Sequence, residues 1–239
     1  MKKFAFVLAL SFVVAGAAFA ANPSLIAGGQ SGTHNIVGSG RDVCWSEPVD
    51  LEGLIASSEI IAQFGLETEI ANDFYFTSNQ TISLARWWGG YYNNNGCGDQ
   101  GVATSWNLKF YDDGGCMPAT MVASYPNSFA NETSVYCQGG FYPIFKYEVS
   151  VSFAATANTL YWFGCNATDH AFPPQCGRVA SAGIVGCDSV FKSAYFSYPD
   201  WTPAIDVFGV AFDASQEFEC GGGSPTESTT WGAIKGLYR

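Results

Sequence analysis

Tyr147-Glu148-Val149-Ser150-Val151-Ser152-Phe153 decides the fold class, because apolar and polar residues alternate along it without interruption. A period of two is typical of a β-strand that places one face in a core and the other in solvent. Trp106–Tyr111 repeats the alternation, with Asn107 and Lys109 on the polar side. Both stretches therefore predict half-buried strands.

Three further runs are rich in aromatic and aliphatic residues and are also expected to be strands: Thr81–Trp88, Thr159–Phe163 and Asp206–Phe212. Thr159–Phe163 is nearly continuous in apolar residues, which predicts a central strand buried on both faces. At most one short helix is expected, near Asp50–Ser58. About nine or ten short strands separated by turn signals predict an all-β fold, an antiparallel two-sheet sandwich that is jelly-roll-like.

The first twenty residues, 1–20, have the three parts of a secretory signal peptide. Lys2 and Lys3 precede an apolar run, Phe4–Val14, and Ala18-Phe19-Ala20 supplies a small-x-small cleavage signal. The apolar run is shorter than the ~20 residues needed to span a bilayer, so we expect cleavage near Ala20 rather than anchoring. The mature chain is therefore expected to be secreted or attached to the cell surface, with no membrane span.

The remaining chain is expected to divide into a flexible N-terminal segment (21–43), one β-sandwich domain (44–220), and a linker with a C-terminal tail (221–239). The tail could be a sorting signal or a plain disordered end. The formal net charge is −11, with only 10 Lys and Arg residues in the chain. Nucleic acid and anionic membranes are poor partners for such a surface, because phosphate backbones are bound by clustered Lys and Arg.

Cysteine usage supports export and predicts a disulfide-stapled domain. Eight cysteines all follow the leader, and they are Cys44, Cys97, Cys116, Cys137, Cys165, Cys176, Cys187 and Cys220. The sequence cannot select among their pairings. Proximity along the chain favours Cys176 with Cys187 and Cys97 with Cys116, and Cys44 pairs with Cys220 if the terminal strands are neighbours. A zinc site is disfavoured, because no C-x-x-C pair occurs and only two histidines could join the thiolates.

Catalytic motifs are lacking: the chain has no G-x-S-x-G and no H-E-x-x-H, and His34 and His170 stand in polar or Gly-rich segments. A glycoside hydrolase on a jelly roll needs only two carboxylates facing across a groove. The pairs Glu67/Glu69 and Glu217/Glu219 each share a strand face, and Glu148 faces away from the core, although a solvated face explains all of them more simply.

No cofactor is expected apart from calcium. Hard cations prefer carboxylate and amide oxygens, and sandwich loops often supply them. Asp73, Asp112 and Asp113 could converge on Ca²⁺ if their strands are neighbours, although a D-D-G-G segment also favours a turn.

Aromatic residues beside a loop provide the strongest functional lead. Trp87, Trp88, Tyr91 and Tyr92 flank Gly89-Gly90, and the loop continues through Asn94. Alternation sends Trp87 and Trp88 to opposite faces, so at least one of them could lie outside the core. Aromatic rings beside amides can stack on a sugar and bond its hydroxyls, which predicts carbohydrate binding. Core packing at a strand end is the competing interpretation.

Three segments have the form of a known sequence pattern. They are Ala71-Asn72-Asp73-Phe74, Ile82–Tyr92 with its Trp-Trp-Gly-Gly-Tyr, and Trp106–Tyr111 followed by Asp112-Asp113-Gly114-Gly115. Together they resemble a pattern in secreted bacterial β-sandwich proteins of uncharacterised function. The chain departs from that pattern at Asn72, where Asp is usual, and in its high cysteine content. The resemblance implies a sandwich and export, but no reaction.

Together these observations favour a secreted or cell-surface binding or structural module, with a glycan or another surface protein as its partner. A jelly-roll glycan hydrolase or lyase that uses paired carboxylates is the alternative.

Overall fold

The computed structural model describes residues 25–27, 43–92, 96–98, 103, 105–168, 170 and 172–221. The expected signal peptide, the tail beyond Gly221, His34 and Asn94 lie outside these residues. No helix within the described ranges is long and apolar enough to cross a membrane.

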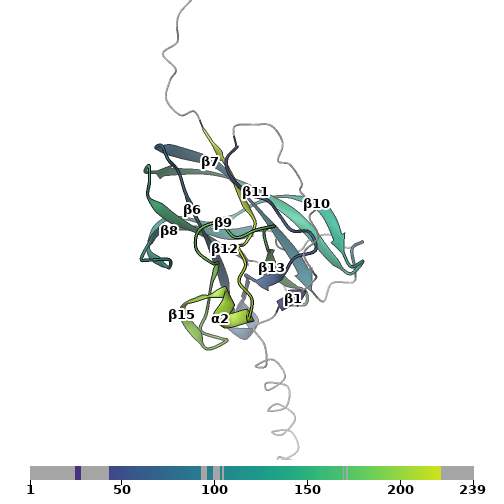
Figure 1. Ribbon diagram of the computed structural model, residues 1–239. Coiled ribbons are helices and arrows are strands. Elements are labelled where there is room, and N and C mark those ends of the chain that lie inside the picture. Colours follow the sequence, from purple (N-terminus) through teal and green to yellow (C-terminus); the bar gives the residue numbers. More distant parts are fainter. Residues whose placement is uncertain are drawn as a thin grey trace, which may run out of the picture.

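Two antiparallel sheets form a sandwich (Figure 1). The eight-stranded sheet has the order β1-β3-β13-β7-β11-β10, and β16 joins it by pairing with both β7 and β2. Its strands are β1 (Leu25–Ala27), β2 (Val43–Glu47), β3 (Ile55–Ser57), β7 (Gln80–Tyr92), β10 (Asn131–Gln138), β11 (Tyr142–Ala155), β13 (Gln175–Val179) and β16 (Gln216–Cys220).

The six-stranded sheet has the order β15-β14-β6-β12-β8-β9. Its strands are β6 (Glu69–Tyr75), β8 (Ser105–Asp113), β9 (Pro118–Ser128), β12 (Leu160–Thr168), β14 (Val190–Ser193) and β15 (Tyr198–Pro203). A two-stranded ribbon of β4 (Ile60–Ile61) and β5 (Leu66–Glu67) encloses the 3₁₀ turn η1 (Ala62–Phe64). One short helix, α2 (Ala204–Phe208), follows β15 directly, and both lie at one end of the molecule in Figure 1.

The predicted all-β antiparallel sandwich is confirmed. Trp106–Tyr111, Thr81–Trp88 and Tyr147–Phe153 lie inside β8, β7 and β11. Burial along β11 alternates as its sequence does, whereas β12 is buried at nearly every position, as expected of a central strand.

Three local expectations were wrong. Asp206–Phe212 is not a strand: α2 begins after Pro203 and ends at Gly209, whose φ of 77° closes the helix in the left-handed region. Asp50–Ser58 forms a turn and then β3 rather than a helix, because its apolar residues pack on the larger sheet. Leu25–Ala27, expected within a flexible segment, forms β1 and pairs with β3.

Aromatic rings fill the space between the sheets. Phe110 of β8 stacks on Phe153 of β11 with ring centroids 4.3 Å apart, and Trp87 of β7 meets the edge of Trp106 at 5.1 Å. Such pairs contribute about 0.5–1.5 kcal/mol beyond the area that they bury. The core therefore combines a large apolar area with fixed ring geometry.

A fully buried guanidinium links the two sheets. Arg178 belongs to β13 of the larger sheet, yet its Nη1 donates to the carbonyl of Phe163 in β12, 3.2 Å away, and its Nη2 donates to the carbonyl of Ser215 at 2.9 Å. The guanidinium also lies 5.4 Å from the centroid of the Phe163 ring. Burial lowers the pKa of Arg178. The charge is thus held by backbone carbonyls from both sides of the sandwich.

Three disulfides staple the domain: Cys44–Cys220, Cys97–Cys137 and Cys116–Cys187. The expected pairing of Cys44 with Cys220 is confirmed, because β2 and β16 are neighbours. The other two expected pairings were wrong. Cys176 faces the core between the sheets, whereas Cys187 packs with the separate cluster around Trp162, so the two cannot meet.

Four bridges were expected, but two cysteines, Cys165 and Cys176, are free and buried. Burial raises the pKa of both thiols, to about 12 for Cys165 and well above the ordinary value for Cys176. Both are therefore shielded thiols rather than reactive ones.

Replacing Arg178 by Met should lower the free energy of unfolding by about 3 kcal/mol or more, because the carbonyls that it serves would stay buried without a donor. Urea denaturation of the mature chain measures this difference. Lys192→Met, which removes an exposed cation from β14, is the control and should change stability by less than about 1 kcal/mol. Equal losses in the two variants would contradict the role assigned to Arg178.

Alkylation of the unreduced chain should label no cysteine in the native state and two in denaturant, at Cys165 and Cys176, because their burial is what protects them. Peptide mapping by mass spectrometry identifies the labelled positions. Absence of label in denaturant would show instead that these two thiols are joined as a fourth bridge.

Candidate functional site

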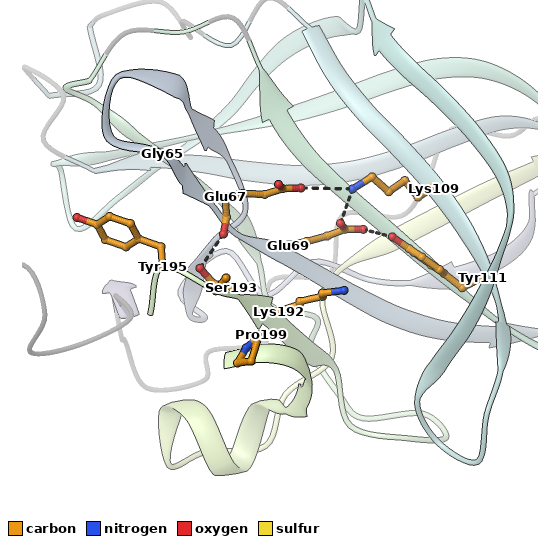
Figure 2. Close-up of a pocket in the computed structure, with 10 residues that line it drawn as sticks. Gly65, Glu67, Glu69, Lys109, Tyr111, Lys192, Ser193, Tyr195 and Pro199 are labelled. Carbon is orange, nitrogen blue, oxygen red and sulfur yellow. Dashed lines mark hydrogen bonds and ion pairs between the residues drawn. The ribbon is translucent and has the colours of Figure 1, made fainter. Parts of the chain in front are cut away.

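A polar groove on the outer face of the six-stranded sheet is the candidate functional site (Figure 2). Its volume is about 320 Å³. The walls come from the β4–β5 ribbon, from β6, β8 and β14, and from the segment that leads into β15 with the start of that strand. They consist of Gly65, Glu67, Glu69, Lys109, Tyr111, Lys192, Ser193, Ala194, Tyr195 and Pro199.

Strand alternation explains which side chains face the groove. Lys109 and Tyr111 are two residues apart in β8 and lie opposite the core residues Leu108 and Phe110. Gly164 of β12 lies between them and β6, and it pairs with both Lys109 and Ala71. A Cβ atom at Gly164 would lie 2.3 Å from Oε1 of Glu69, so only glycine lets this carboxylate cross over β12.

Glu69 is the centre of the groove's hydrogen bonds. Its Oε2 lies 2.6 Å from Nζ of Lys109, and its Oε1 accepts a hydrogen bond of 2.8 Å from the hydroxyl of Tyr111. Glu67 reaches the same ammonium from farther away, at 3.8 Å, and its side chain is 63% exposed. Burial, and then the charge of Glu69, raise the pKa of Tyr111, so its hydroxyl stays a donor rather than a base.

Aromatic rings lie beside these charges. Trp201 meets the edge of Tyr111 at 5.5 Å between ring centroids, and Nζ of Lys192 lies 5.6 Å from the centroid of Trp201. In Figure 2, Tyr195 and Tyr111 stand at opposite ends of the set, with Glu69 and Lys109 between them. The groove therefore offers acceptors, donors and ring surfaces within one recess.

The expected aromatic platform on β7 is not formed, and this prediction was wrong for three of its rings. Trp87 and Tyr91 are 0% exposed in the core between the sheets, and Trp88 is 4% exposed on the opposite face. Alternation does separate the two tryptophans, but Val49 and Leu51 cover the outer one. Only Tyr92 is partly exposed, and it stacks on Tyr142 at 6.0 Å.

The expected calcium ligands do not form a ready site. No group of three or more His, Cys, Asp or Glu side chains within the described ranges is placed to hold a metal ion. Asp113 uses its Oδ1 to accept from the Trp162 indole and its Oδ2 to accept from the amide of Gly115, both at 3.0 Å. Asp112 faces away from Asp113, as neighbours in a strand do, and Asp73 is buried in β6.

The other carboxylates that were considered as an acid and base pair have a structural role. Glu148, Glu217 and Glu219 all bind the guanidinium of Arg86 on the outer face of the larger sheet. Burial alone would lower the pKa of Arg86, but the hydrogen bonds that it donates to these carboxylates raise it. Acids that are tied to one cation cannot form an acid and base pair across a groove.

Glu59 brings His170 and Cys176 together, but this arrangement is not nucleophilic. Nε2 of His170 lies 3.4 Å from Oε2 of Glu59, which also accepts a 2.6 Å hydrogen bond from the amide of Cys176. The side chains of Glu59 and His170 are both 0% exposed, and burial raises the pKa of the Cys176 thiol, which stays protonated. The cluster therefore joins polar groups that are buried in the fold.

Sequence reasoning named Glu67 and Glu69 as sharing a strand face but did not identify the groove. The alternation in Trp106–Tyr111 could have placed Lys109 and Tyr111 together on the polar face of β8. Lys192 and Tyr195 carried no such signal, because their approach to β8 depends on the order of strands in the sheet.

Stability should fall as the pH rises through about 8, because burial raises the pKa of Glu59 from 4.5 to about 8. The folded state binds this proton more tightly than the unfolded state, so its contribution is full below about 4.5 and is lost above the folded pKa. Glu59→Gln should therefore reduce the difference in unfolding free energy between pH 5 and pH 9 by on the order of 2–4 kcal/mol. Urea denaturation at each pH measures it.

Glu67→Gln is the matched control for this measurement, since that side chain is 63% exposed and should leave the pH profile unchanged. An unaltered profile in Glu59→Gln would show that Glu59 is ionised in the folded chain.

Comparisons with protein-family models, with curated proteins and with solved structures found no match. The chemistry of the groove is therefore the basis for a functional assignment.

Proposed function

We propose that this protein is an extracellular β-sandwich module that binds a saccharide in the groove around Glu69. The signal-like leader, the three disulfides and the absence of a spanning helix among the described residues support an exported chain. A glycan is the proposed ligand, and no catalysis is required of the module.

The observation that carries the proposal is the mixture of groups in one recess. A saccharide presents hydroxyls at its edge and an apolar face of C–H groups, so it is bound by charged or amide side chains together with aromatic rings. Glu67 and Lys192 provide exposed charges, and Tyr195 provides a ring that is 46% exposed. The groove is also largely preformed, because Glu69 is fixed by Lys109 and Tyr111.

Glycan hydrolysis or elimination is the alternative, since Glu67 and Glu69 lie in the same groove. Both carboxylates face one ammonium from the same side of the recess, whereas a hydrolase needs them on opposite sides of the scissile bond. This arrangement favours binding over turnover.

Tyr195→Ala should weaken glycan binding by about 1–3 kcal/mol while leaving the fold intact, because the ring is a contact surface and not a core residue. A glycan array with the mature chain identifies the ligand, and titration calorimetry with that glycan measures the loss. Tyr75→Ala is the matched control, since Tyr75 is 45% exposed on another surface.

Failure of every glycan on the array to bind would reject the proposal, as would equal losses in Tyr195→Ala and Tyr75→Ala. A reducing-sugar assay run beside the array tests the alternative. Turnover that disappears in Glu69→Gln would make the protein an enzyme.

A further inference from the structure

A second acidic cluster lies away from the groove. It is on the part of β6 that follows the residues paired with β14. Asp73 of β6 is 1% exposed, Asp213 is 0% exposed, and Gln216 at the start of β16 is 0% exposed. The amide of Gln216 donates to the backbone carbonyl of Asp73 at 2.8 Å, which brings β16 to this edge. Two segments distant in the sequence, β6 and the chain that leads into β16, therefore meet here.

Each of these side chains has one oxygen without a hydrogen-bond donor: Oδ1 of Asp73, Oδ1 of Asp213 and Oε1 of Gln216. Leaving a buried acceptor without a partner costs about 1–3 kcal/mol, and more when it carries charge. No Lys, Arg or His within the described ranges forms an ion pair with either aspartate. Like charges are thus buried together without a compensating cation from the protein.

The other oxygens of the two aspartates hold one loop. Oδ2 of Asp213 accepts from the amide of Val185 at 2.5 Å, and Oδ2 of Asp73 accepts from the amide of Cys187 at 3.2 Å. Gly186 lies between them with a φ of 90°, and a Cβ atom there would lie 2.3 Å from Oδ2 of Asp73. The loop is therefore fitted closely around the carboxylates, and Oδ1 of each accepts no hydrogen bond from it.

An open recess borders this cluster on one side. Asp213 forms part of the wall of an open recess of about 320 Å³, together with the loop backbone at Ser181–Ile184.

We propose that Asp73, Asp213 and Gln216 form a binding site for a calcium ion that joins β6 and β16 to the loop 181–187. Calcium takes oxygen ligands from carboxylates, amide side chains and backbone carbonyls in flexible geometry, and magnesium requires a stricter octahedron. Two carboxylates and one amide oxygen supply the site, with water completing the shell, so it needs no third acidic ligand. It shares only Asp73 with the site expected from the sequence, and it is independent of glycan binding.

Glu47 lies beside this site but is not one of the ligands. Its Oε1 accepts from the indole of Trp45 at 2.9 Å, and its Oε2 accepts from the amide of Asn72, so both oxygens are occupied.

Calorimetry with CaCl₂ on the full mature chain tests the proposal at about pH 8, above the pKa values of about 6 for Asp73 and about 7 for Asp213, both of which are raised by burial. One ion should bind, and millimolar CaCl₂ should raise the melting temperature relative to chelator. Asp213→Asn should weaken calcium binding about tenfold or more. In chelator it should melt no lower than the wild type, because it removes a buried charge.

Asp112→Asn is the matched control, since Asp112 lies on β8 outside the cluster, and it should bind calcium as the wild type does. Asp73→Asn provides a second test of the same loss if Asp213→Asn does not fold. The proposal is overturned if the wild type gives neither heat nor a thermal shift, if the folded Asn variants bind as the wild type does, or if Asp112→Asn loses binding.

Discussion

The contact on which the sandwich depends is that of one buried guanidinium with carbonyls on both sides of the interface. Arg178 stands in β13, yet it donates to Phe163 in β12 and to Ser215 just before β16. Apolar packing between sheets is nondirectional and tolerates sliding, whereas a planar guanidinium can satisfy its acceptors in only one relative position of the strands. This contact therefore restricts how the two sheets are placed against each other.

The groove shows how strand pairing within the six-stranded sheet produces a site. Glu69, Lys109 and Lys192 come from three different strands, and none is near another in the sequence except through strand pairing. Gly164 permits the Glu69 carboxylate to cross β12 and reach its two partners on β8. A Cβ atom there would meet both the Glu69 carboxylate and the Tyr111 ring, so the arrangement of these two side chains depends on this glycine.

The alternation of apolar and polar residues predicted most of the fold, because a strand with one buried face needs an apolar side chain at every second position. Tyr147–Phe153 and Trp106–Tyr111 are examples. The wrong predictions have separate causes. Trp88 alternates outward as expected, but the segment around Val49 and Leu51 covers it, and nothing in the sequence near Trp88 indicates that cover.

The helix after Pro203 was missed because its aromatic residues resemble a strand, although Pro203 and Gly209 mark its two ends. Disulfide partners and the groove depend on strand order, which a single sequence does not encode locally.

The bond between Cys44 and Cys220 has a mechanical consequence. It joins the first strand of the main body to the last, at a sequence separation of 176. Tension applied to the chain outside these two residues passes through a covalent bond rather than through the sheets, so the strands between them carry no load. A protein fixed at one end and pulled at the other would extend only outside this loop, and the domain would keep its shape under a force that unravels an unbridged sandwich.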